Sequence, residues 1–318
     1  MRAAHGGSLD PQTLDFSASV NPLGPPDAVR EVLARAGELV LRYPSVDADV
    51  LCAAVAKHHG VSEASVLCGN GSAELIYLVA QALRGERVWL ARPCFGEYEA
   101  ACRAFGVELC DDPAGASASF AASPTSPQGV LADPAALLAL PGLRVIDEAF
   151  MGFTDERTSL VGRAAADSGV IVLRSLTKLC AVPGLRIGYL VAHPDWVALL
   201  RGYQPPWSVN ALAQAAGAAA LGDTAYLVRT RAEVASLRAE LAAGLAALGL
   251  PPEPAHANYL LCRVPSARTL GAALLRRGIA VRDCTSFTGL EPDRWLRVAV
   301  RTSPENARLL AALREVLA

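Results

Sequence analysis

The chain has 318 residues, of which 52% are hydrophobic and 19% charged, and its formal net charge is −2. This composition excludes a disordered chain and a small disulfide-stapled scaffold, and the charge gives no field that would attract nucleic acid or an anionic membrane. No apolar run reaches the roughly 18 residues that span a bilayer, and the start of the sequence lacks the apolar segment of a signal peptide. We therefore expect a cytoplasmic protein that binds neither nucleic acid nor membranes.

The predicted elements divide the chain into three parts. Residues 1–38 form a turn-rich lead with one short helix at about 26–37. Residues 39–205 alternate short apolar strands with helices, which indicates an α/β domain with a mostly parallel sheet between two helical layers. Residues 206–318 begin with alanine-rich helices and continue with strands and further helices, which suits a small α+β domain. We expect the lead to pack against this small domain.

Strands and helices of the α/β part follow each other closely. We expect strands at 65–68, 87–91, 144–150 and 169–176. We expect helices at 47–59 and 73–83 and a further helix within 92–105. The only low-complexity stretch, AGASASFAAS at 114–123, is expected to be a loop.

Cysteines and histidines show no metal-ligand spacing. None of the eight cysteines forms a C-x-x-C pair, and most lie in apolar segments, so we expect small core residues in a reducing compartment. The adjacent His58 and His59 are expected to form a solvated helix end. A bound metal is not expected.

Lysine is the most informative residue type, because only Lys57 and Lys178 occur among 29 basic residues. A chain that otherwise uses arginine keeps lysine where arginine cannot replace it, for instance where an amine forms a Schiff base with an aldehyde. Lys57 lies near the end of a predicted helix, where its charge suits the helix dipole. Lys178 has no such explanation.

The segment SLTKLCAVPGLRIGY (175–189) places hydroxyl groups and an arginine around Lys178. Ser175, Thr177 and Arg186 would make a phosphate cradle beside the amine, as a phosphorylated aldehyde cofactor requires. The segment resembles the lysine motif of the fold-type-I aminotransferases, which depend on pyridoxal 5′-phosphate (PLP). The resemblance implies a large PLP-binding α/β domain plus a small α+β domain, with Lys178 as the catalytic lysine.

Further residues extend this resemblance to the rest of the cofactor site. A glycine turn, GNGSAE, joins a predicted strand to a helix, and its free amides would suit the cofactor phosphate. These amides belong to Gly71, Ser72 and Ala73. Asp147 matches the family aspartate that pairs with the pyridine nitrogen, and Phe95 matches the aromatic residue that stacks on the ring. Taken singly, the turn, the acid and the phenylalanine each have an ordinary structural explanation.

Three other positions bear on assembly and activity. Tyr43 matches a family tyrosine that reaches the cofactor phosphate of the neighbouring subunit, so the resemblance implies a homodimer. Ser126 stands where an asparagine commonly bonds the ring hydroxyl, and Phe150 stands where many members have a tyrosine. The chain is also short at about 106–123, where relatives carry an extra strand and loop. Reduced activity therefore remains an alternative.

The two ends of the chain resemble the threonine-phosphate decarboxylase branch of this family, which serves cobalamin biosynthesis. The resemblance rests on an HGG near the start, DFSASVNPLGPP, IAVRDCTSFTGL and LRVAVRTSPEN. It implies a small phosphorylated amino acid, L-threonine O-3-phosphate, as the substrate that loses CO2. Arg282 and Arg297 would bind its phosphate and carboxylate, in an order that the sequence leaves open. His5, with Ser19 or Asn21, would close over the phosphate.

Two alternatives stay open at this point. An aminotransferase of the histidinol-phosphate type shares the fold, the lysine and a phosphorylated substrate, although Phe150 and Ser126 argue mildly against it. A non-catalytic protein with the PLP fold is suggested by Ser126 and the shortened middle. The presence of Lys178, Asp147 and Arg186 weighs against this second alternative.

Overall fold

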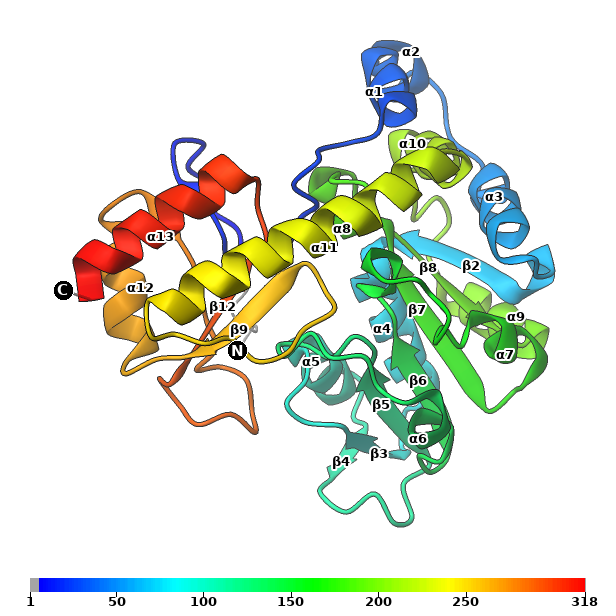
Figure 1. The fold of residues 1–318 in the computed structure, drawn as a ribbon. Coiled ribbons are helices and arrows are strands. Elements are labelled where there is room, and N and C mark those ends of the chain that lie inside the picture. Colours follow the sequence, from blue (N-terminus) through cyan, green and yellow to red (C-terminus); the bar gives the residue numbers. More distant parts are fainter. Residues whose placement is uncertain (1–5, 318) are drawn as a thin grey trace.

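A seven-stranded sheet forms the centre of the larger part of the molecule (Figure 1). The computed structural model describes residues 6–317, so the predicted substrate residue His5 lies outside the described residues. The strands have the spatial order β2-β8-β7-β6-β5-β3-β4. They are β2 (Val66–Asn70), β3 (Arg87–Leu90), β4 (Glu108–Cys110), β5 (Ala118–Ala122), β6 (Leu143–Asp147), β7 (Val170–Ser175) and β8 (Ile187–Ala192). β8 is antiparallel to both of its neighbours and the other pairs are parallel, which confirms a mostly parallel α/β sheet.

Helices cover both faces of this sheet because its central strands are apolar on both sides. In β7, Val170 and Val172 join one buried cluster while Ile171 and Leu173 join the other, as the two-residue period of a strand requires. The first cluster includes α3 (Asp49–His59), α6 (Pro134–Leu138), α7 (Val161–Ala166), α8 (Leu176–Leu179) and α10 (Ala211–Gly222). The second cluster includes α4 (Gly71–Ala82), α5 (Gly96–Ala104) and α9 (Pro194–Tyr203).

The expectation of a loop at 114–123 is wrong for residues 118–122. Residues Ala118–Ala122 form β5, which pairs with β3 on one side and β6 on the other. Alanine and serine have low strand propensity, so the sequence carries no local strand signal here. Burial between two helical layers selects these small side chains, and Ser119 satisfies its hydroxyl by donating to the Pro141 carbonyl at 2.8 Å. Tertiary context therefore overrides local propensity.

The smaller part of the molecule is a three-stranded antiparallel sheet covered by helices. Its strands are β9 (Tyr259–Arg263), β11 (Arg282–Asp283) and β12 (Trp295–Ala299), in the order β11-β12-β9, and its helices are α12 (Ala267–Leu275) and α13 (Ser303–Leu317). The lead adds β1 (Leu14–Asp15), which pairs in parallel with β10 (Ile279–Ala280). Leu14 and Phe16 are buried in the core of this domain, so the first half of the lead packs against it.

Two helices link the lead and the small domain to the large domain. Helix α1 (Asp27–Ala34) buries Val29 in the apolar cluster of the large domain, together with α10. Helix α11 (Thr224–Ala247) runs from one domain to the other (Figure 1), with Tyr226 in the large-domain cluster and Leu241 in the small-domain core. The remaining short helices are α2 (Ala36–Leu39), η1 (Glu63–Ser65), η2 (Met151–Phe153) and η3 (Pro183–Leu185).

The helices and the cysteines of the fold can be compared with what the composition led us to expect. Among the helices in the described range, none combines the length and apolar character that crossing a membrane requires. All eight cysteines are free thiols, and six of them are buried. They act as small core residues, as expected.

Candidate active site

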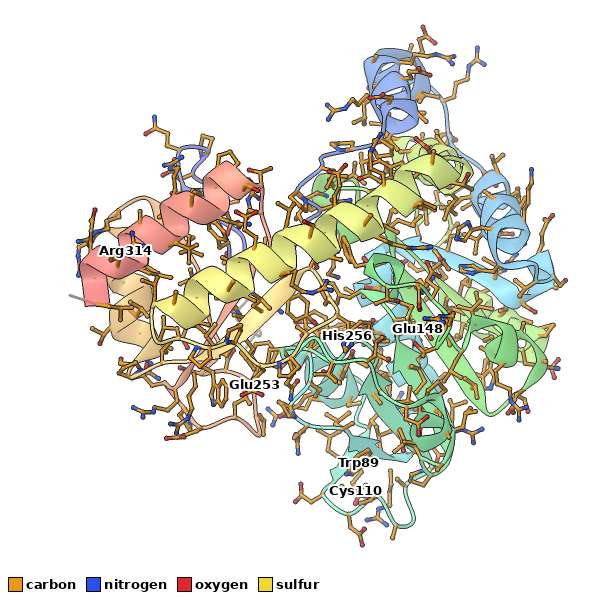
Figure 2. All side chains as sticks on the ribbon, viewed as in Figure 1. Trp89, Cys110, Glu148, Glu253, His256 and Arg314 are labelled. Carbon is orange, nitrogen blue, oxygen red and sulfur yellow. The ribbon has the colours of Figure 1, made fainter. Side chains whose placement is uncertain are left out.

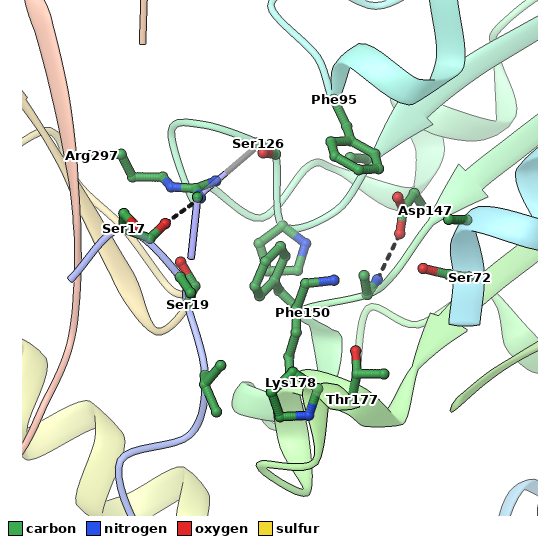
Figure 3. A pocket seen from close by; sticks show the side chains of 18 of the residues that line it. Ser17, Ser19, Ser72, Phe95, Ser126, Asp147, Phe150, Thr177, Lys178 and Arg297 are labelled. Atoms are coloured by element: carbon green, nitrogen blue, oxygen red, sulfur yellow. Dashed lines mark hydrogen bonds between the residues drawn. The ribbon is translucent and has the colours of Figure 1, made fainter. Parts of the chain in front are cut away.

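A cavity of about 270 Å³ lies at the carboxyl ends of β6 and β7, where open α/β sheets bind ligands. Both domains and the lead contribute to its walls (Figure 3). The predicted site residues that line it are Ser19, Ser72, Ala73, Phe95, Ser126, Asp147, Phe150, Thr177, Lys178, Arg186 and Arg297. In Figure 3, Asp147, Phe95 and Ser72 lie on one side of Lys178, and Ser17, Ser19 and Arg297 lie on the other.

The N-terminus of α4 enters the cavity because two glycines allow close packing around it. Gly71 has a φ of +77°, and a Cβ there would come within 2.6 Å of the Arg186 guanidinium. Gly188 on β8 faces the same turn, and a Cβ there would come within 2.4 Å of the Ser72 amide nitrogen. The turn therefore brings the Ser72 and Ala73 amides and the Arg186 guanidinium to one place. Helix-terminal amides beside a guanidinium suit a phosphate group.

Hydroxyl groups from the start of α8 complete this end of the cavity. Ser175 ends β7, and its Oγ lies 2.7 Å from Oγ1 of Thr177, which lines the cavity. Arg186 has a φ of +55° and donates to the Pro183 carbonyl at 3.2 Å. A non-glycine residue in the left-handed region costs on the order of 1 kcal/mol, and such residues gather at functional sites. The structure thus brings together the residues expected to form the phosphate cradle.

Lys178 lies in the middle of the cavity on the single turn of α8. Its Nζ is 4.8 Å from the centroid of the Phe150 ring. Burial lowers the pKa of Lys178 to about 8, and the positive charges of Arg297 and Arg186 add to this, while the Asp147 carboxylate opposes it. A lysine with this pKa has an appreciable neutral fraction near neutral pH. Its amine can therefore act as a nucleophile toward an aldehyde.

Asp147 is a buried carboxylate at the end of β6, and the residue that holds it was not predicted. Its Oδ2 accepts a hydrogen bond of 2.6 Å from the Tyr98 hydroxyl, and its Oδ1 accepts one of 2.9 Å from the Ala149 amide. Tyr98 follows Phe95, the N-cap residue of α5, by three residues, but nothing in the local sequence indicates its contact with Asp147. The two rings meet edge to face at 5.8 Å.

The other end of the cavity is formed by the lead and the small domain. Arg297 on β12 lies over the Tyr259 ring at 4.9 Å and donates to the Ser17 carbonyl at 3.4 Å. Within the described residues the buried Ser19 hydroxyl has no hydrogen-bond partner. A buried hydroxyl without a partner is costly unless a ligand or a water molecule satisfies it. Ser19 and Arg297 together therefore suit an anionic group of a substrate.

Asn21, which the sequence offered as an alternative to Ser19 at the substrate phosphate, is not among the residues that line the cavity. Its side-chain nitrogen donates to the Leu179 carbonyl and the Tyr226 hydroxyl, both at 2.8 Å. Its backbone amide donates to the Lys178 carbonyl at 3.0 Å. Asn21 therefore satisfies the carbonyls at the end of α8, which a helix of one turn cannot pair by itself.

Arg282 and Tyr43 also lie outside the cavity wall. Arg282 stands opposite Arg297 in the β11–β12 ladder, but its guanidinium donates to Ser286 at 3.1 Å and lies over the Phe287 ring. Tyr43 is 85% exposed, and its ring lies 5.2 Å from that of Trp207. Neither residue is among those that line the cavity, although Arg282 lies directly across the ladder from Arg297.

A buried ionic network lies beneath the site. Glu148, which follows Asp147, sits inside the large domain (Figure 2) and accepts a 3.2 Å hydrogen bond from Arg174. Arg174 also pairs with Glu156, which accepts a further hydrogen bond of 2.7 Å from Arg231 on α11. Burying these charges is tolerable because each is paired. The network ties the ends of β6 and β7 to the helix that joins the two domains.

His58 and His59 differ from the solvated helix end that we expected. Both are partly buried, and His59 Nε2 lies 2.7 Å from the Tyr189 hydroxyl. Burial lowers the pKa of His59 to about 3. Together with Glu156 the two histidines offer ligand atoms within 4.8 Å of one another. Two guanidinium groups already neutralise the Glu156 carboxylate, so the trio is a poor host for a cation.

Comparison with known proteins defines the class. The model of the aminotransferase class I and II family matches residues 11–313, so the chain belongs to this family. Threonine-phosphate decarboxylase from Salmonella typhimurium is 36% identical, covering 99% of this chain and 97% of that protein. Histidinol-phosphate aminotransferase from Nitratidesulfovibrio vulgaris is 35% identical, covering 95% and 88%. The crystal structure of L-threonine-O-3-phosphate decarboxylase from Porphyromonas gingivalis superposes with a TM-score of 0.88 at 27% identity, covering 96% of this chain and 99% of that one.

These findings confirm the predicted family, the fold-type-I architecture and PLP as the cofactor. The residues present also fit PLP chemically. The cavity offers amides and a guanidinium for a phosphate, an amine of lowered pKa for an aldehyde, and a buried carboxylate for a ring nitrogen. The protein is a PLP-dependent enzyme of the class I and II aminotransferase family.

Proposed function

We propose that the protein is a carboxy-lyase that converts L-threonine O-3-phosphate to aminopropanol phosphate and CO2, in cobalamin biosynthesis. The observation that carries this proposal is the match to the Salmonella typhimurium decarboxylase over 99% of this chain. That match includes the lead and β12, which supply Ser17, Ser19 and Arg297 to the cavity. The histidinol-phosphate aminotransferase covers 95% of the chain.

In the proposed reaction PLP supplies an electron sink for the bond that breaks at Cα. Ser72, Ala73 and Arg186 would hold its phosphate, and Asp147 would hold the proton of its ring nitrogen. Lys178 would supply the amine that meets its aldehyde. With a pKa of about 8, the Lys178 amine would also carry the proton that returns to Cα.

The substrate phosphate would be held at the opposite end of the cavity. The Arg297 guanidinium and the Ser19 hydroxyl, which has no partner in the described part of the chain, would act as donors there. A cofactor fixed at one end and a phosphate fixed at the other leave the substrate little rotational freedom about Cα. This arrangement can keep the Cα–carboxylate bond perpendicular to the cofactor ring, which is the orientation that lets it break.

An aminotransferase of the histidinol-phosphate type is the second candidate, because the relative from Nitratidesulfovibrio vulgaris is 35% identical. The same cofactor residues would serve it, but it requires a keto acid to complete each cycle. A non-catalytic protein is the third reading. The lowered pKa of Lys178 argues against it, as does the Ser19 hydroxyl, which has no partner among residues 6–317.

The experiment measures CO2 release and the visible spectrum of the PLP-loaded protein with L-threonine O-3-phosphate and no keto acid. Sustained CO2 release supports the decarboxylase. Turnover only with histidinol phosphate and a keto acid supports the aminotransferase. A protein that forms no visible band with PLP, or whose band does not change when either substrate is added, supports the non-catalytic reading.

We also propose that the protein works as a homodimer in the cytoplasm, with Tyr43 reaching the cofactor phosphate of the neighbouring subunit. Apolar side chains gather around this exposed tyrosine, including Leu41, Val50 and Trp207. Such a surface favours association with another chain. Sedimentation analysis tests the dimer. A Tyr43→Phe variant should bind PLP more weakly and should still sediment as a dimer. A wild-type protein that sediments as a monomer would contradict the proposal.

A further inference from the structure

Both oxygens of the Asp147 carboxylate are bonded to donors of the chain itself. The Tyr98 hydroxyl donates to Oδ2 at 2.6 Å and the Ala149 amide donates to Oδ1 at 2.9 Å. Rotation about the Cβ–Cγ bond of an aspartate is broad and roughly two-fold, so the side chain alone does not fix the plane of its carboxylate. Two donors on different oxygens do fix it.

Tyr98 is itself held rigidly. Only 1% of it is exposed, and its ring packs 5.8 Å from Phe95 and 5.5 Å from Phe120. Burial and the neighbouring Asp147 carboxylate raise the pKa of the phenol well above its ordinary value, so it stays a donor at all working pH values. The Tyr98 hydroxyl therefore fixes the orientation of the Asp147 carboxylate relative to α5.

We propose that Tyr98 is a positioning residue that acts through Asp147 and aims the carboxylate at the ring nitrogen of PLP. A carboxylate held in this plane meets the ring nitrogen without reorganising when the cofactor binds. The Ala149 amide alone would leave Oδ2 free to turn. This inference rests on the proposed placement of the ring nitrogen at Asp147.

The test uses holoenzyme loaded with PLP that carries 15N in the ring, and it compares the ring nitrogen signal in four proteins. These are the wild type, Tyr98→Phe, Asp147→Asn and the control Tyr189→Phe. Tyr189 is also buried, and its hydroxyl bonds His59 and Arg174 away from the cavity. We expect Tyr98→Phe to move the signal part of the way from the wild-type value toward that of Asp147→Asn, and Tyr189→Phe to leave it in place.

The same proteins give a second readout. Turnover should fall roughly tenfold in Tyr98→Phe with little change in KM, because the ring partner is misaligned and the substrate site is intact. If Asp147→Asn moves the ring nitrogen signal and Tyr98→Phe does not, Tyr98 is only a packing residue. The inference about Tyr98 then fails, while the proposed placement of the cofactor stands. If Asp147→Asn also leaves the signal unchanged, the proposed placement of the cofactor fails and the inference fails with it.

Discussion

The two ends of the cavity are built in different ways. The cofactor end consists of Ser72, Asp147 and Lys178, which lie at or beside the ends of β2, β6 and β7 in one sheet. The substrate end joins the lead to the small domain through contacts such as that between Arg297 and Ser17, which are 280 residues apart. Strand ends of one buried sheet are rigid, whereas the substrate end depends on how two domains meet.

This difference determines which residue roles a short sequence motif can predict. At the cofactor end each predicted residue is fixed by its own strand, turn or helix terminus. At the substrate end a residue's role depends on which neighbours the fold brings to it. Substitutions at the two ends should therefore have different effects.

Lys178→Ala should have the largest effect, because it removes the amine at the centre of the cofactor end. We expect loss of the visible band of the PLP-loaded protein and a drop in turnover of roughly 10³-fold or more. Lys57→Ala is the matched control, since it removes the other lysine, which lies on an exposed helix end. An unchanged band in Lys178→Ala, or a lost band in Lys57→Ala, would refute the assignment of the catalytic lysine.

Lys178→Met should make the cofactor-free protein more stable at pH 7. The pKa of Lys178 is about 8 in the fold against an ordinary 10.5, so its buried charge costs on the order of 3 kcal/mol below pH 8. That cost is relieved as the pH rises from about 8 toward 10.5, because the folded state loses its proton first. The wild type should therefore gain stability over this range and the variant should not.

Urea unfolding at several pH values between 7 and 10 measures this effect. Lys57→Met, which replaces a solvent-exposed lysine, should behave as the wild type does. If the free energy of unfolding changes with pH in the same way in Lys178→Met and in the wild type, burial of the Lys178 amine carries no such cost.

Arg297→Ala should weaken binding of the phosphorylated substrate, whereas Arg282→Ala should not. Arg297 lines the cavity, and a hydrogen bond from a charged donor contributes about 1.5 to 3 kcal/mol, so KM should rise about tenfold to a hundredfold. Arg282 is bonded to Ser286 outside the wall, so we expect a change of less than about threefold. Equal effects of the two variants on KM would mean that the substrate end closes further in solution.

The sequence signals for the predicted cofactor residues are local, and the structure brings Ser72, Asp147 and Lys178 to one cavity. A lysine after an apolar strand and glycines before a helix determine Lys178 and Ser72 through a few neighbouring residues. Tyr98 was missed because its contact with Asp147 joins residues 49 apart. The strand at 118–122 was missed because its alanines and serines owe their conformation to burial in the sheet. Long-range packing leaves no local pattern to detect.

The last comparison separates Asn21 from Ser19, two lead residues that the sequence treated as interchangeable. Asn21→Ala removes two buried hydrogen bonds, to the Leu179 carbonyl and the Tyr226 hydroxyl, so the free energy of unfolding should fall by about 2 kcal/mol while KM changes little. Ser19→Ala removes a hydroxyl that has no partner in the described structure, so stability should hold while KM rises several-fold. Urea unfolding and KM, measured on both variants, show which residue stabilises the fold and which binds the substrate. Should Asn21→Ala raise KM at unchanged stability, the end of the α8 helix would not need its cap, and Asn21 would belong to the substrate end after all.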